Sequence, residues 1–208
     1  MTNKDNLAPQ NETLSSIARR RSIRMFLDKP VPDEHIMAIL RAANQAPSAH
    51  NQQSWKFIVV RGDMKKDLAH LVTFRANDFP RPASALLRMA SRSILSAPVV
   101  IAVANTGQLM ARGTDLFKVE KEMAQDFFRT MEIQNSAAAA ENLLVAATSL
   151  DLATVWLGIL FLIKDDVLNL LGEPHGEFMA VIPVGYAARS PVPGPKKIPV
   201  DQVTKNLG

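Results

Sequence analysis

A polar loop that runs directly into an apolar strand, at residues 47–60, constrains the fold of this chain more than any other feature. Its sequence is Pro-Ser-Ala-His-Asn-Gln-Gln-Ser-Trp-Lys-Phe-Ile-Val-Val. Pro47 ends any helix before it, because proline has no backbone N–H group and restricts the preceding residue. The aromatic and β-branched residues from Trp55 to Val60 are typical of a buried strand. The chain must therefore combine helices with a sheet.

The loop itself is rich in hydrogen-bonding side chains. Ser48, Asn51 and Gln53 offer one hydroxyl and two amide groups, which can donate and accept around the edge of a flat heteroaromatic ligand. Polar groups at the end of a buried strand are a common place for such a ligand. An ordinary connection between a helix and a strand uses the same residue types. The loop alone therefore leaves both interpretations open.

Helical and strand patterns alternate along the rest of the chain. Apolar runs predict two further strands, at residues 98–104 and 178–186. Helical spacing, together with start and stop residues, predicts helices at residues 12–21, 33–46, 62–72, 83–95, 116–150 and 165–171. Residues 74–82 are expected to be a loop, and residues 108–114 irregular or the start of the next element. The prolines after Ser190 predict an extended arm.

Composition narrows the class of protein. A chain of 208 residues with 47% hydrophobic content can bury one sizeable core, so we expect a single domain over residues 12–208. A polar arm is expected before it, at residues 1–11, and the domain should end in an extended arm from about residue 190. The absence of Cys excludes disulfides, iron–sulfur clusters and Cys-based zinc sites. The four His residues lie far apart without metal-ligand spacing, so no metal is expected.

Charge and hydropathy indicate the partners. A net charge of +4 suits an anionic ligand such as a phosphate or a dinucleotide. Nucleic acid would suit the same charge, but the chain has no nucleic-acid-binding motif. The longest apolar run, residues 155–163, is too short to span a bilayer, and the N-terminus lacks the apolar core of a secretory signal. We therefore expect a soluble, cytoplasmic protein that binds neither nucleic acid nor a membrane.

Several short elements occur together in a recognisable order. They are Arg20-x-Ser22-x-Arg24, Pro47-Ser48-x-x-Asn51-x-Gln53, Trp55-x-Phe57, Thr154-Val155-Trp156-Leu157-Gly158, Ile182-Pro183-Val184-Gly185-Tyr186 and Lys196-Lys197. With this set the chain resembles the FMN-dependent nitroreductase family over roughly residues 12–200. Each element is weak alone, but the order of all six is specific.

The resemblance implies an α+β fold of three layers, α/β/α, in which helices flank a central, mainly antiparallel sheet. It also implies a homodimer with FMN at the interface and a C-terminal arm that reaches across to the partner subunit. The reaction would be ping-pong: NADH or NADPH reduces the flavin and leaves, and a nitroaromatic, quinone or similar electrophilic acceptor then takes two electrons. The flavin would carry the chemistry, so no catalytic side chain is expected.

The same resemblance assigns residues to the cofactor. Arg20 and Ser22 would hold the phosphate, with Lys196 and Lys197 closing over it, because guanidinium groups make bidentate contacts to phosphate. Arg24 would face the N1–C2=O2 edge, which gains negative charge on reduction. A solvated basic surface would explain the first arginines equally well, and an ion pair with Asp28 would explain Arg24.

Two further regions contact the flavin ring by resemblance. The turn at residues 156–158 would bring a backbone N–H close to N5, and Phe117 would line the acceptor pocket. The complete expected cofactor set is Arg20, Arg21, Ser22, Arg24, Pro47, Ser48, Ala49, Asn51, Gln53, Trp156, Leu157, Gly158, Lys196 and Lys197.

Two departures from the family pattern stand out. Ser54 occupies the position where the family usually has proline, and no residue of the 74–95 region aligns with a family contact to the flavin, although Arg75, Asn77 and Arg81 are candidates. The alternatives are a specialised flavin enzyme of the same fold, such as a dehalogenase or a flavin-fragmenting enzyme, or a non-catalytic flavin- or nucleotide-binding protein. The physiological acceptor and the choice between NADH and NADPH stay open.

Overall fold

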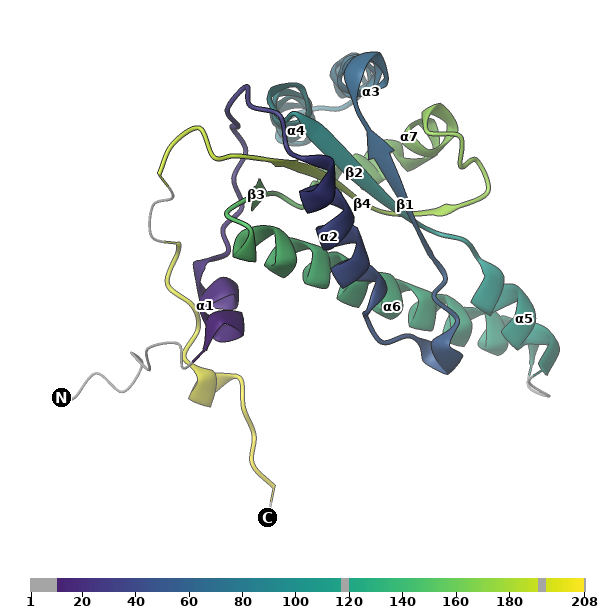
Figure 1. The fold of residues 1–208 in the computed structure, drawn as a ribbon. Helices are drawn as coiled ribbons and strands as arrows, with labels where there is room; N and C mark the ends of the chain where they lie inside the picture. The colour runs from purple at the N-terminus through teal and green to yellow at the C-terminus, as the bar shows by residue number, and fades with distance from the viewer. Residues whose placement is uncertain (1–10, 117–119, 191–193, 208) are drawn as a thin grey trace.

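The computed structural model describes residues 11–116, 120–190 and 194–207, and its centre is a four-stranded sheet (Figure 1). The strands follow the order β1-β2-β4-β3, and all neighbouring pairs are antiparallel. Their bounds are β1 (Trp55–Val60), β2 (Val99–Asn105), β3 (Ala153–Thr154) and β4 (Glu177–Gly185). The predicted strand at residues 55–60 is confirmed with its bounds, and the other two predicted strands are confirmed to within one residue at each end.

The middle of the sheet is almost completely buried. Every residue of β2 is buried, as are the last six residues of β4, because helices cover both faces. In the register, Ile101 pairs with Val59 on one side and with Ile182 on the other. These β-branched residues fit the pleated, doubly covered surface that such a strand requires.

Helices lie on both faces of the sheet, so the predicted α+β fold with an α/β/α arrangement is confirmed. One core cluster joins the sheet to α3 (Gly62–Arg75), α4 (Ala83–Ser96) and α7 (Lys164–Leu170). A second cluster joins the opposite face to α2 (Asp33–Asn44) and α6 (Lys121–Ser149). Figure 1 shows α3 and α4 above the sheet and the long α6 below it.

The N-terminal helix lies at one end of α6. α1 (Glu12–Arg19) starts at Asn11, whose side-chain oxygen accepts a hydrogen bond from the Leu14 N–H at 3.0 Å and so caps the first turn. The expected arm at residues 1–11 lies outside the described residues except for Asn11. Among the helices that the structure describes, none is long and apolar enough to cross a membrane.

Several predicted boundaries were wrong. α3 continues to Arg75, so the expected loop at residues 74–82 begins inside a helix and continues as a short 3-10 helix, Ala76–Asp78. Residues 108–116 form a separate helix, α5 (Gln108–Leu116), and α6 begins at Lys121 rather than at residue 116. The short strand β3 and the 3-10 helix Gly158–Ile163 were missed, because two-residue strands and irregular turns carry no periodic signal.

Candidate functional site

The basic segment at residues 20–24 runs beside the edge strand β3. α1 ends at Arg19, and Arg20 adopts an extended conformation that turns the chain toward the sheet. Ser22 forms a parallel bridge with Thr154, and the Ile23 N–H donates to the Thr154 carbonyl at 2.9 Å. Thr154 lies two residues before the turn at residues 156–158. The bridge therefore brings the basic segment close to this turn.

The turn at residues 156–158 offers a free backbone surface. The Leu157 N–H donates to the Val181 carbonyl at 2.9 Å, which ties the turn to β4. Gly158 is exposed, and a Cβ added there would meet only Trp156 within 4 Å, at 3.8 Å. The described neighbours therefore leave room for a ligand to approach this backbone closely.

The three arginines of the basic segment have different surroundings. Arg20 is half-buried, and its Nε lies 3.9 Å from Glu141 Oε1 of α6. Arg21 donates from Nη1 to the carbonyls of Ala18 and Arg20, both at 2.7 Å, and so serves the end of α1. Arg24 is exposed, and within the described part of the chain it forms no ion pair, with Asp28 or with any other acid.

The C-terminal segment passes beside the same arginines. A Cβ added at Gly194 would lie 2.9 Å from Arg21 Nε, so the backbone of this segment packs against that side chain. Lys196 and Lys197 follow at once and are exposed. The structure thus brings the C-terminal basic pair into the neighbourhood of residues 20–24.

The polar loop at residues 47–53 has an unusual backbone. His50, Asn51 and Gln53 have φ angles of 53°, 51° and 50°. The left-handed conformation costs a residue other than glycine about 1–2 kcal/mol, although asparagine tolerates it better. Local bonds support the turn: Ser48 Oγ accepts from the Gln53 N–H at 3.1 Å. The sequence predicted a polar loop here but could not predict this strain.

Two residues from outside the loop hold it in place. Asn135 of α6 accepts a hydrogen bond on Oδ1 from the Ala49 N–H at 3.2 Å, and Arg112 of α5 donates to Gln52 Oε1 at 3.4 Å. Sequence reasoning missed Asn135. Its signal was the polar pair Asn135-Ser136 at the start of an alanine-rich helical run, on the same helix face as Glu132.

The loop and the basic segment lie at different places along α6. Glu141 contacts the basic segment and Asn135 contacts the loop, and six residues of helix correspond to about 9 Å along its axis. Figure 1 accordingly shows α1 near one end of α6 and the loop nearer its middle. Within the described residues of a single chain, no hydrogen bond or ion pair joins these two groups.

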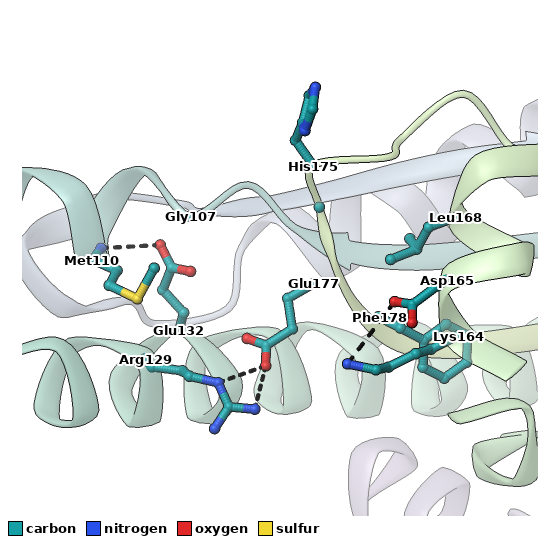
Figure 2. Close-up of a pocket in the computed structure, with 11 residues that line it drawn as sticks. Gly107, Met110, Arg129, Glu132, Lys164, Asp165, Leu168, His175, Glu177 and Phe178 are labelled. Carbon is teal, nitrogen blue, oxygen red and sulfur yellow. Dashed lines mark hydrogen bonds and ion pairs between the residues drawn. The ribbon is translucent and has the colours of Figure 1, made fainter. Parts of the chain in front are cut away.

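A cavity of about 250 Å³ lies elsewhere, between the start of α5, α6, α7 and β4 (Figure 2). Four of its charged side chains form ion pairs. Arg129 donates from Nε to Glu177 Oε1 at 2.8 Å, and Lys164 Nζ lies 4.0 Å from Asp165 Oδ1. None of the predicted cofactor residues lines the cavity, so it is not the expected cofactor site.

The acid at the wall of this cavity, Glu132, is almost fully buried. Its Oε1 accepts from the Leu109 N–H at 2.8 Å and from the Met110 N–H at 3.4 Å, so it caps the first turn of α5. Burial raises the pKa of Glu132 above its ordinary value, the two N–H groups oppose this rise, and the charge of Glu177 adds to it.

The predicted acceptor-pocket residue, Phe117, lies outside the described residues, directly after α5. Among the described residues, no group of three His, Asp or Glu side chains could hold a metal ion.

Comparison with known proteins now identifies the family. Residues 17–186 match the model of the Nitroreductase family. The chain belongs to the nitroreductase family. A relative from Archaeoglobus fulgidus, with the provisional name NADH dehydrogenase/NAD(P)H nitroreductase, is 34% identical over 149 residues, which are 71% of this chain and 68% of the relative.

Two further matches within the family matter for the site. One solved structure is of a provisionally named nitroreductase from Desulfovibrio desulfuricans in complex with FMN. It is 26% identical to this chain, the match covers 96% of this chain and 98% of the other, and the TM-score is 0.71. Iodotyrosine deiodinase 1 from Rattus norvegicus is 28% identical over 207 residues, which are 90% of this chain and 66% of the relative. The chain is thus similar to proteins that are named for different reactions.

Proposed function

We propose that this nitroreductase-family chain binds FMN and uses NADH or NADPH to reduce nitroaromatic, quinone or similar electrophilic acceptors. Family membership supports the class, a flavin oxidoreductase. The observation that carries the proposal is the bridge between Ser22 and Thr154, which sets the basic segment beside the open turn at residues 156–158. One neighbourhood thus has both cations for a phosphate and exposed backbone for a ring.

The residues present fit the phosphate of FMN. Arg20 Nε lies 3.9 Å from a carboxylate oxygen of Glu141, and the exposed Lys196 and Lys197 follow Gly194, which packs against Arg21. Guanidinium and ammonium groups bind phosphate through charge-assisted hydrogen bonds.

The residues also fit the flavin ring. FMN supplies two-electron transfer when bound, and the protein's part is to orient it and to set its electronic environment. Arg24, exposed and without an ion pair among the described residues, would place its charge against the N1–C2=O2 edge. Gly158 would let backbone approach the central ring, and Ser48, Asn51 and Gln53 would bind a polar edge.

The separation of the loop from the basic segment supports a homodimer. We infer that the loop in contact with one FMN comes from a second copy, since no described hydrogen bond or ion pair joins the loop to the basic segment within one chain. Apolar side chains that are exposed in the described chain support the same conclusion. Leu14 and Ile17 of α1 and Met123 and Phe127 of α6 are 45%, 51%, 62% and 48% exposed, and a second copy would bury part of this apolar surface.

A second candidate reaction is reductive dehalogenation of an iodinated phenol, and the likeness to the rat iodotyrosine deiodinase favours it. That reaction needs polar groups that close over the phenol. Residues 74–82, a loop by sequence and a candidate lid, begin at the end of α3 on the face of the sheet opposite α6 (Figure 1). This segment therefore lies away from the polar loop, which is bonded to α6.

The decisive experiment is spectroscopic and kinetic. Protein loaded with FMN and freed of excess cofactor should show flavin absorbance, and it should oxidise NADH or NADPH only when a nitrofuran or a naphthoquinone is added. Absence of bound flavin would refute the cofactor, and bound flavin without oxidation would indicate a non-catalytic flavin-binding protein. Release of iodide from an iodotyrosine, with no turnover of the other acceptors, would favour dehalogenation instead.

A further inference from the structure

One turn of α6 carries three buried polar side chains, each of which holds a different part of the molecule. Glu132, Asn135 and Ser136 are 1%, 7% and 0% exposed. Glu132 caps the start of α5, Asn135 accepts from the Ala49 N–H of the polar loop, and Ser136 donates to Asn105 Oδ1 at the end of β2. The buried polar side chains of α6 thus gather in one turn, which links three neighbouring elements.

The hydrogen bond to Asn135 comes from the start of the 3-10 helix within the loop. Ala49 is the first residue of the 3-10 helix Ala49–Asn51, and its N–H is one of the donors that a helix start leaves without an internal partner. The strained residues His50 and Asn51 follow directly. The other outside contact, from Arg112 to Gln52, is long and exposed. Asn135 is therefore the buried anchor of the loop.

The second polar atom of Asn135 shows that packing alone does not explain this residue. Its Nδ2 is buried without a hydrogen-bond partner among the described residues. A leucine would fill a similar volume without leaving a buried donor unsatisfied. An asparagine at this position is therefore accounted for by its acceptor, Oδ1, and by the loop N–H that the acceptor binds.

We propose that Asn135 is a positioning residue for the flavin-binding loop. It fixes the Ala49 N–H and thereby sets the backbone on which Ser48, Asn51 and Gln53 present their polar side chains. It acts on FMN through the loop and does not itself contact the cofactor. This inference rests on the proposed function, because it requires that the loop binds FMN.

The test breaks the bond from each side. Asn135→Leu removes the acceptor, and Ala49→Pro removes the donor without altering α6, at a helix start where proline is tolerated. Each variant should weaken FMN binding about tenfold, and the double variant no further, because both remove the same bond.

Ser136→Ala is the matched control: it removes a buried bond from the same turn but leaves the loop untouched. It should lower the melting temperature while the Kd for FMN stays within about threefold of the parent.

Fluorescence titration gives the Kd, and the visible circular dichroism of bound FMN, at saturating cofactor, reports the geometry of the ring edge. Asn135→Leu and Ala49→Pro should change this spectrum alike, and Ser136→Ala should not. Additive effects of the two substitutions, or an equal loss with Ser136→Ala, would overturn the proposal. If Asn135→Leu does not fold, a Kd of Ala49→Pro equal to that of the parent overturns it alone. A parent protein that binds no FMN would instead refute the proposed function, whatever the variants do.

Discussion

Arg20 and Arg24 lie four residues apart on one extended segment, yet the structure gives them different surroundings. Arg20 is half-buried against α6, with Glu141 at 3.9 Å, and Arg24 is exposed without an ion pair among the described residues. A cation at the phosphate acts on a charge that is constant during turnover. A cation at the N1–C2=O2 edge acts on charge that appears only on reduction. The two residues should therefore affect different measurements.

The first prediction separates these roles. Arg20→Ala should weaken FMN binding and leave the midpoint potential unchanged, whereas Arg24→Ala should lower the potential. Loss of about 1.4 kcal/mol of stabilisation of the two-electron reduced state corresponds to about 30 mV. A redox titration at saturating FMN measures both variants. Glu141→Gln is the control, because it removes the acid beside Arg20 and should leave FMN binding intact. A larger potential shift in Arg20→Ala than in Arg24→Ala would reverse the assignment.

The second prediction concerns Glu132, whose pKa is raised chiefly by burial. A raised pKa in the folded state means that the folded protein holds this proton more tightly than the unfolded chain does. The stability contributed by the proton is therefore fully present below the ordinary Glu value of 4.5 and is lost as the pH rises through the folded value. At neutral pH the buried carboxylate lowers the stability of the parent relative to a neutral side chain of the same shape.

Glu132→Gln, which cannot titrate, isolates this effect. The free energy of unfolding of the parent, relative to that of the variant, should fall as the pH rises from 4.5 through the raised pKa, and should then become constant. The size of the fall is about 1.4 kcal/mol for each unit by which the pKa is raised. Urea unfolding of both proteins across this range measures it. A difference that rises with pH, or that does not change, would contradict the burial argument.

At this scale the sequence offers candidate site residues by their types and spacing, but not the residues that support them. The arginines, the loop amides and the glycine turn have recognisable types and spacing, and the structure brings residues 20–24 and 154–158 together. Asn135 and Glu141 belong to α6, and their partners lie 86 and 121 residues away in the sequence. Such partners follow only from the packing of helices, which sequence periodicity does not define.

Among the elements, α5 shows how packing sets a helix boundary that sequence periodicity does not define. Leu109 of α5 forms a small apolar cluster with Ala124 and Phe128 of α6, apart from the two main cores. Gly113 faces Phe128 so closely that a Cβ would lie 2.4 Å from the ring. One long helix was predicted from about residue 116, because helical spacing alone does not show where the chain folds back on itself. The three longer strands, by contrast, were predictable, since buried β-branched runs leave little ambiguity.

The third prediction tests this contact between helices. Gly113→Ala should destabilise the protein although alanine favours helices by about 1 kcal/mol, because overpacking a buried ring costs about 1–3 kcal/mol. Chemical unfolding measures the change. Phe128→Leu provides the control: in the double variant the smaller side chain makes room, so the combined loss should be less than the sum of the two single losses. Strict additivity would mean that the two helices do not meet at this point.

At the scale of the whole molecule, the C-terminal segment, residues 194–207, exposes several apolar side chains. Ile198, Val200, Val203 and Leu207 are 65%, 74%, 67% and 82% exposed, and only the short 3-10 helix Val200–Gln202 interrupts the irregular chain of residues 194–207. Figure 1 shows this segment leading away from the sheet, past α1. The sequence predicted an extended arm here because of its prolines. The surface that would cover it has no signal in the residue pattern, and only the family resemblance points to a partner subunit.

The fourth prediction assigns this segment two separable tasks, dimer contact and phosphate contact. Deletion of residues 190–208 should lower both the dimer content and the FMN occupancy. Ile198→Ser/Val203→Ser should weaken the dimer, because it removes apolar surface that a partner would bury, while keeping both lysines. Lys196→Ala/Lys197→Ala should leave the dimer intact and weaken FMN binding at low salt more than at high salt, because high salt screens the contribution of exposed charges in the parent as well.

Sedimentation equilibrium and FMN titration measure dimer content and FMN binding on the same samples. A flavin-loaded, well-folded monomer after the deletion would refute the dimer, and equal effects of both double variants on both measurements would refute the division of tasks.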